Sequence, residues 1–116
     1  MGIRSQVGFC VAPGIEVPRF EDIEPNWEFD KVIRDERGTL YFVDEVKWYD
    51  FDDREGNGVV SKVGTFLASL NAEDYLFIEM YPGDGYGMET EISGGWWNND
   101  FGLGYISRVC YEDETK

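Results

Sequence analysis

The alternation of hydrophobic and polar residues predicts strands along much of the chain. The strongest run is TLYFVDEVKWY at residues 39–49, which is rich in the aromatic and β-branched residues that favour strands. Side chains of a strand alternate between its two faces, so we expect Phe42, Val46 and Trp48 to enter the core. Asp44 interrupts that face and predicts a bulge or a strand end at Asp44–Glu45. We interpret this stretch as the central strand.

The rest of the chain supplies further strands and two helices. Strands are predicted at residues 3–12, 75–81, 88–93 and 103–111. The apolar spacing of residues 59–70 indicates a one-sided helix. Weaker helical spacing predicts a short turn before Pro25 and a second helix at about 25–35. The order predicts an α+β fold: one mostly antiparallel sheet of about five strands, with two helices packed on one face.

Length and charge limit the classes of function. The 116 residues fit a single domain spanning 1–116, with a frayed tail at 112–116. The chain has 24 acidic and 10 basic residues and a net charge of −14. Such a surface repels nucleic acids and anionic membranes, so we expect neither to bind directly. A basic protein surface is the natural partner, although the acidic residues could also serve solubility alone.

Cysteine usage and hydropathy indicate a reducing compartment. Cys10 and Cys110 are the two cysteines of the sequence, and a disulfide-stabilised secreted domain usually carries more. No signal peptide opens the chain, and no segment approaches the roughly 20 apolar residues of a membrane-spanning helix. We therefore expect a cytoplasmic protein with reduced thiols. Pairing of the terminal strands would still make the two cysteines neighbours.

The sequence argues against an enzyme and against a bound cofactor or metal. It has no histidine, which excludes Ser-His-Asp and Cys-His catalysis. The loop 50–58, DFDDREGNG, fails the EF-hand pattern because Arg54 falls on a ligand position and Ser61 on the bidentate glutamate position. The glycines of 83–87 precede acidic, strand-like sequence and so do not form a phosphate loop. Glu89 and Glu91 share a strand face, but such pairs arise by chance among so many acids.

Two loops are candidates for binding a partner protein. One is the acidic loop, with Asp50, Asp52, Asp53 and Glu55. The other is GGWWNND at residues 94–100, whose Trp96 and Trp97 could act as anchors, since tryptophan is enriched at interface hot spots. The alternative is that one or both tryptophans fold back over the sheet. Exposed aromatic residues on an edge strand would also support a homodimer, and composition leaves this open.

A set of short motifs runs through most of the chain. They are Gly2-Ile3-Arg4, Val7-Gly8, Leu40-Tyr41, Val46 to Tyr49, Glu73-Asp74-Tyr75, Gly95-Trp96-Trp97 and Phe101-Gly102-Leu103. In this ordered set the chain resembles small acidic proteins of tailed-bacteriophage genomes that have no assigned activity. The resemblance implies a phage or prophage origin and a bacterial host cytoplasm. It assigns no role to any residue.

Two hypotheses of function follow. In the first, the chain is a non-enzymatic, phage-derived inhibitor whose acidic surface occupies a basic, nucleic-acid-binding surface of a host protein. It would then act as an anti-defence or host-takeover protein, such as an anti-CRISPR, by mimicking DNA. In the second, it sequesters a small molecule such as a signalling nucleotide beneath the aromatic loop. An anionic ligand would require arginines to converge in one pocket; the candidates are Arg4, Arg19, Arg34 and Arg108.

Overall fold

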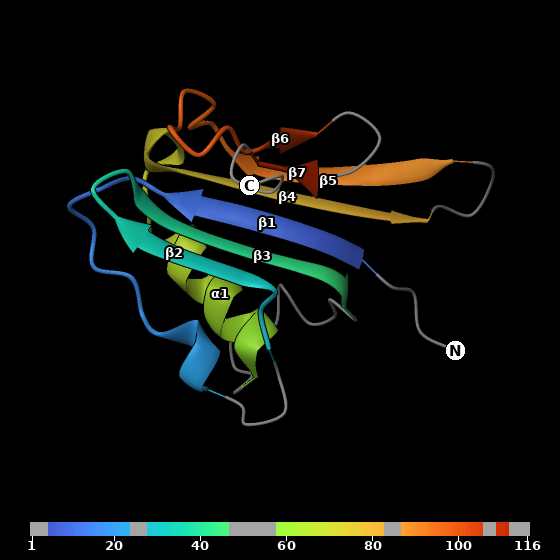
Figure 1. Cartoon of the computed structure of the whole chain (residues 1–116), viewed down its shortest axis with the longest axis horizontal. Coiled ribbons are helices and arrows are strands. Elements are labelled where there is room, and N and C mark those ends of the chain that lie inside the picture. Colours follow the sequence, from blue (N-terminus) through green and yellow to red (C-terminus); the bar gives the residue numbers. More distant parts are fainter. Residues whose placement is uncertain (1–4, 24–27, 47–57, 83–86, 106–108, 112–116) are drawn as a thin grey trace.

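The fold is an antiparallel sheet with one α-helix, as seen in a computed structural model of the chain (Figure 1). The structure describes residues 5–23, 28–46, 58–82, 87–105 and 109–111. Five strands form the main sheet in the order β2-β3-β1-β4-β5, and every neighbouring pair is antiparallel. Their bounds are β1 Ser5–Val11, β2 Lys31–Asp35, β3 Gly38–Val46, β4 Tyr75–Pro82 and β5 Met88–Gly94. The prediction of an α+β fold with one antiparallel sheet is confirmed.

The middle of the sheet is β1 rather than the stretch expected there. β3 contains most of the predicted central strand but lies one place off centre, between β1 and β2. β1 contacts a strand on each side, and Val7, Phe9, Cys10 and Val11 are all buried. Of the two alternatives predicted at Asp44–Glu45, a bulge or a strand end, the bulge is confirmed, because these two residues of β3 oppose one residue of β1.

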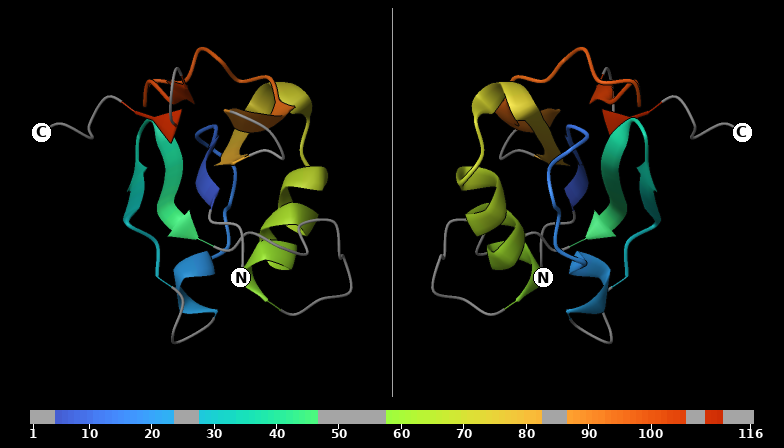
Figure 2. Two further views of the ribbon diagram at one scale, coloured as in Figure 1. Left: turned by 90° about the vertical axis from the view of Figure 1, so that its right-hand side faces the viewer. Right: turned by 90° about the vertical axis from the view of Figure 1, so that its left-hand side faces the viewer.

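Each face of the sheet packs against a different layer (Figure 2). One face meets the helix α1, Val59–Ala68, and the short 3-10 helix η1, Phe20–Asp22. The opposite face is covered by the C-terminal segment, which includes β6, Gly104–Tyr105, and β7, Val109–Cys110. β3 is therefore buried on both sides: Tyr41 faces α1, and Phe42 faces the C-terminal segment. A second 3-10 helix, η2 at Ala72–Asp74, leads into β4.

The second predicted helix is wrong, since β2 is a strand at Lys31–Asp35. Val32 packs with the core on the α1 side, whereas Ile33 packs with the core on the other side. This alternation of neighbouring residues belongs to a strand. A tight turn then leads to Gly38, whose φ is +117° and where a Cβ would lie 2.2 Å from the Val11 carbonyl oxygen. A short segment with few apolar residues fits a helix and a strand equally well. Pairing with β3 makes this segment a strand.

The single C-terminal strand predicted at 103–111 is also wrong. Gly104 pairs with Cys110 and Tyr105 with Val109, so the chain reverses direction between β6 and β7. Leu103 and Val109 are then both buried in the core on the β6–β7 side of the sheet.

The helix predicted at 59–70 is confirmed as α1, with Gly58 at its N-cap. Within the parts of the chain that the structure describes, no helix is both long and apolar enough to cross a membrane.

Candidate protein-binding surface

The tryptophan loop, residues 95–103, begins directly after β5 and crosses to the β6–β7 side of the sheet (Figures 1 and 2). Its first residues are tied to the start of β4. The Gly95 N–H donates to the carbonyl oxygens of Ala72 at 2.6 Å and Tyr75 at 3.0 Å, and the Trp96 N–H donates to the Tyr75 oxygen at 3.0 Å. Gly94 has a φ of +82°, and a Cβ there would lie 2.3 Å from that same oxygen. Only glycine fits this sharp exit from β5.

Asn99 fixes the loop from the inside. Its side chain is buried, with 8% of the residue's surface exposed. The Asn99 Nδ2 donates to the Trp96 carbonyl oxygen at 2.9 Å, and its Oδ1 accepts from the Leu103 N–H at 2.8 Å. A buried amide bonded at both ends closes the loop on itself. These bonds join both ends of the tryptophan loop without any partner.

The two tryptophans have different environments. Trp96 is partly buried against the sheet and lies edge-on to Phe101, with ring centroids 6.5 Å apart. Trp97 points outward, with 49% of its surface exposed, and its ring lies 6.4 Å from that of Tyr105, which is 39% exposed. The tryptophan that folds back over the sheet is thus Trp96. Trp97 and Tyr105 together form an exposed aromatic pair.

Sequence reasoning singled out Trp97 but missed Tyr105 and Asn99. Tyr105 reads as an ordinary strand residue, and it joins Trp97 only because β6 starts where the tryptophan loop ends. Nothing in the run Asn98-Asn99 distinguishes the buried amide from its exposed neighbour. Both contacts come from tertiary structure.

Exposed acidic residues lie on the tryptophan loop and on the 3-10 helix bonded to it. Glu73 of η2 and Asp100 of the tryptophan loop are both exposed, and η2 is bonded to that loop through the carbonyl oxygen of Ala72. The acidic loop residues predicted to bind a partner, Asp50, Asp52, Asp53 and Glu55, lie outside the described residues, as do Trp48 and Tyr49.

A further acidic group lies where β4 and β5 pair. Glu79 faces Glu91, and Tyr81 faces Glu89 across the two strands. The Ser5 Oγ donates to Glu79 Oε2 at 2.6 Å, and the Tyr81 hydroxyl donates to Glu91 Oε1 at 3.1 Å. Burial raises the pKa of Glu79, and the charge of Glu91 adds to this effect. No described residues gather three or more potential metal ligands.

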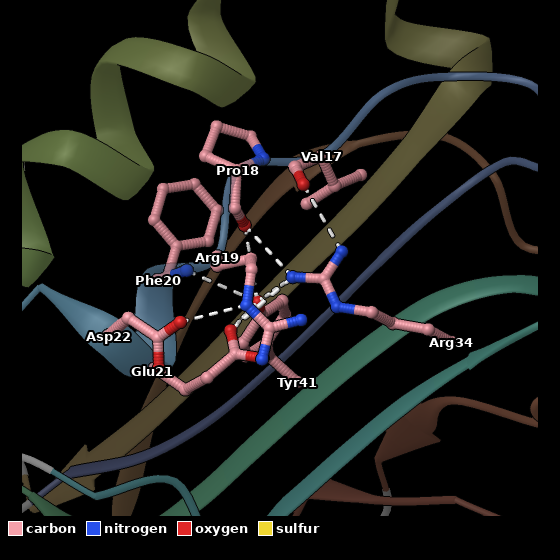
Figure 3. Close-up of polar contacts among 8 residues, drawn as sticks. All are labelled: Val17, Pro18, Arg19, Phe20, Glu21, Asp22, Arg34 and Tyr41. Carbon is pink, nitrogen blue, oxygen red and sulfur yellow. Dashed lines mark hydrogen bonds and ion pairs between the residues drawn. The ribbon is translucent and has the colours of Figure 1, made fainter.

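Two of the four arginines proposed to bind an anion do converge, but on a carboxylate of the protein itself (Figure 3). Arg34 donates to Glu21 at 3.3 Å and to the carbonyl oxygens of Val17 at 3.1 Å and Pro18 at 3.0 Å. Arg19 donates to Asp22 at 2.8 Å and lies 3.7 Å from the other oxygen of Glu21. These guanidinium groups are already paired. Arg4 and Arg108 lie outside the described residues.

The hydroxyl of Tyr41 sits at the centre of this group. Tyr41 is fully buried, and its hydroxyl contacts Glu21 and Arg34 through short hydrogen bonds and accepts from the Phe20 N–H at 3.3 Å. Burial and the bond to Glu21 raise the pKa of Tyr41. Burial would raise the pKa of Glu21 as well, but hydrogen bonds from Tyr41 and Arg34 outweigh it and the pKa falls. The group fastens η1 to the sheet.

A shallow pocket of about 350 Å³ lies beside this group, between the turn at residues 12–15 and the β2–β3 hairpin. Arg34 contributes to its lining together with Asp35 and Glu36. Two acids against one arginine disfavour an anionic ligand such as a nucleotide. The pocket therefore adds no support to the hypothesis of a nucleotide-binding protein.

Cys10 is a free, buried thiol in the middle of the sheet. Burial raises its pKa to about 12, so the reactive thiolate is scarce and a nucleophilic role is disfavoured.

In comparisons with known proteins, the chain matched no family model, no curated protein and no solved structure.

Proposed function

We propose that this chain is a non-enzymatic, phage-derived binding protein that occupies a basic surface of a host protein. Its anchor would be the aromatic pair of Trp97 and Tyr105, and its acidic residues would supply the charge complementarity. If the host surface normally binds nucleic acid, the chain competes for it as a DNA mimic and acts in anti-defence. The phage origin and the host cytoplasm rest on the sequence resemblance alone.

The observation that carries the proposal is the exposed aromatic pair on a preformed loop. Aromatic side chains bring large contact areas to an interface, and tryptophan and tyrosine are enriched among hot spots. Because Asn99 and Gly94 already fix the loop, binding would require little further ordering of the backbone. The net charge of −14 then selects a basic partner and accelerates its approach.

The test is a pull-down from bacterial lysate at low and high salt, followed by mass spectrometry. We expect one nucleic-acid-handling protein to be retained at low salt and lost at high salt, because contacts between exposed charges are screened. Trp97→Ala should lose that protein, whereas substitution of Lys62, an exposed residue of α1, should keep it. A clean blank with the wild-type chain would contradict the proposal and redirect attention to a small ligand.

A matched pair of charge variants separates local from global electrostatics. Glu73→Lys with Asp100→Lys changes exposed acids of η2 and the tryptophan loop. Glu16→Lys with Glu28→Lys changes exposed acids on other segments. Each pair adds four charge units, so both take the net charge from −14 to −10. Loss of the partner only with the first pair supports a defined interface. Equal loss with both pairs would show that net charge alone drives the contact.

A further inference from the structure

β5 forms one edge of the five-stranded sheet (Figure 1). On one side it pairs with β4, and no other described strand pairs with it. Two backbone bonds show which of its groups point outward. The Ala12 N–H donates to the Asp74 carbonyl oxygen, and the Gly95 N–H donates to the Tyr75 carbonyl oxygen. The backbone N–H and C=O groups of even-numbered residues of β4 therefore point toward β1, and those of odd-numbered residues point toward β5. By the alternation of an antiparallel ladder, the N–H and C=O groups of Thr90 and Ile92 point away from β4.

The two faces of this edge differ in chemistry. Glu89 and Glu91 pair with Tyr81 and Glu79, and they lie on the α1 side of the sheet. Ile92 pairs with Ile78, lies on the opposite side and is 41% exposed. An added strand would therefore meet two carboxylates on one face and an apolar side chain on the other.

A second copy of this chain does not suit the edge in the register centred on Thr90. If two β5 strands paired antiparallel about Thr90, Glu89 of each copy would lie opposite Glu91 of the other. Like charges directly opposite each other destabilise a strand pair. Charged residues on an edge strand are a recognised device against such self-pairing. A strand with basic residues at the same positions would instead form favourable pairs.

We infer that β5 accepts an extended basic segment of the partner protein as a sixth, antiparallel strand. Lysine or arginine residues at alternate positions would lie beside Glu89 and Glu91, and the apolar residues between them would pack on Ile92. A cation there would also relieve the repulsion between Glu91 and Glu79. The inference rests on the proposed function, because Trp97 lies just beyond the end of β5 and would contact the same partner.

The probe is a blocked octapeptide of alternating lysine and valine, with a glutamate–valine peptide as the charge control. Binding is measured by calorimetry, and the amide resonances of Thr90 and Ile92 are followed by NMR. Thr90→Pro removes an outward N–H without breaking the β4–β5 ladder, since proline is tolerated on the solvent side of edge strands. Thr90→Ala keeps that N–H and is the matched variant. Urea unfolding of each variant confirms that the fold is retained.

We expect the basic peptide to bind wild type and Thr90→Ala alike and to bind Thr90→Pro at least about tenfold more weakly. The acidic peptide should not bind. Equal binding to Thr90→Ala and Thr90→Pro would show a contact through charge alone and would overturn the inference, as would failure of the basic peptide to bind wild type. Neither result would contradict the proposed function, whose test is the Trp97-dependent pull-down.

Discussion

Removing the hydroxyl oxygen of Tyr41 measures how much its hydrogen bonds with Glu21 and Arg34 contribute to the stability of the fold. Tyr41→Phe deletes the oxygen that contacts Glu21, Arg34 and the Phe20 N–H. The ring itself keeps its packing, which includes a stacked contact with Phe9 at a centroid distance of 5.0 Å and an edge contact with Phe29 at 4.6 Å. The substitution therefore isolates the hydrogen bonds from the hydrophobic core.

The expected cost follows from what the deletion leaves behind. A hydrogen bond to a charged group contributes roughly 1.5–3 kcal/mol to stability, and a buried donor without a partner costs about 1–3 kcal/mol. Arg34 still reaches Glu21 at 3.3 Å and the Pro18 oxygen at 3.0 Å, which limits the loss. We expect Tyr41→Phe to lower the free energy of unfolding by about 2 kcal/mol.

Urea unfolding followed by tryptophan fluorescence measures this change, with the midpoint as readout and an unchanged slope as the check on the unfolded state. The matched control is Tyr81→Phe, because the Tyr81 hydroxyl also donates to a glutamate, Glu91 at 3.1 Å, but in an exposed contact between β4 and β5. That variant should leave the urea midpoint almost unchanged. Equal losses in the two variants would refute the idea that burial makes the Tyr41 group stabilising.

Three further predictions concern single residues. Gly94→Ala should cost about 2 kcal/mol in urea unfolding, because it forces an L side chain to a φ of +82° and a Cβ to 2.3 Å from the Tyr75 oxygen; an unchanged midpoint would contradict this geometry. Pulse alkylation with peptide mapping should modify Cys10 only after unfolding, because its pKa is about 12 when buried. Burial raises the folded-state pKa of Glu79, so the wild type loses stability as the pH rises from about 4, the ordinary pKa of a glutamate, through that raised pKa. Glu79→Gln does not titrate and should therefore gain stability relative to the wild type over the same range, measured by urea unfolding at each pH. The removal of Glu91 by mutation should shrink that gain.

The local pattern of apolar and polar residues was sufficient to predict α1 and β3. α1 carries a one-sided apolar stripe, and its buried residues follow the helical period. β3 was predicted as a strand with a bulge or a strand end at Asp44–Glu45, because the charged Asp44 interrupts a run of apolar residues, and a bulge forms there. In each case, a pattern within about a dozen residues determines the structure.

The errors arise where distant contacts determine the structure. β2 has only Val32 and Ile33 as partly buried residues, too few to define a period, and its conformation depends on pairing with β3. β1 is central because β3 and β4 both pair with it, and pairing order is not written in any one segment. The group of Glu21, Arg34 and Tyr41 brings together residues from three elements and has no sequence signature.

The tryptophan loop itself gives the strongest physical reason to look for a partner. Trp96 already covers the sheet, so the fold gains little from a second tryptophan that leaves 49% of its surface in water. Yet the chain buries the polar Asn99 to hold the loop in place, and a buried amide costs stability unless its hydrogen bonds are made. A loop built only to cap the sheet would not need to present Trp97 beside Tyr105. Removing the outward ring with Trp97→Ala should therefore leave the urea midpoint almost unchanged while abolishing partner capture, and a large loss of stability instead would assign Trp97 to the fold.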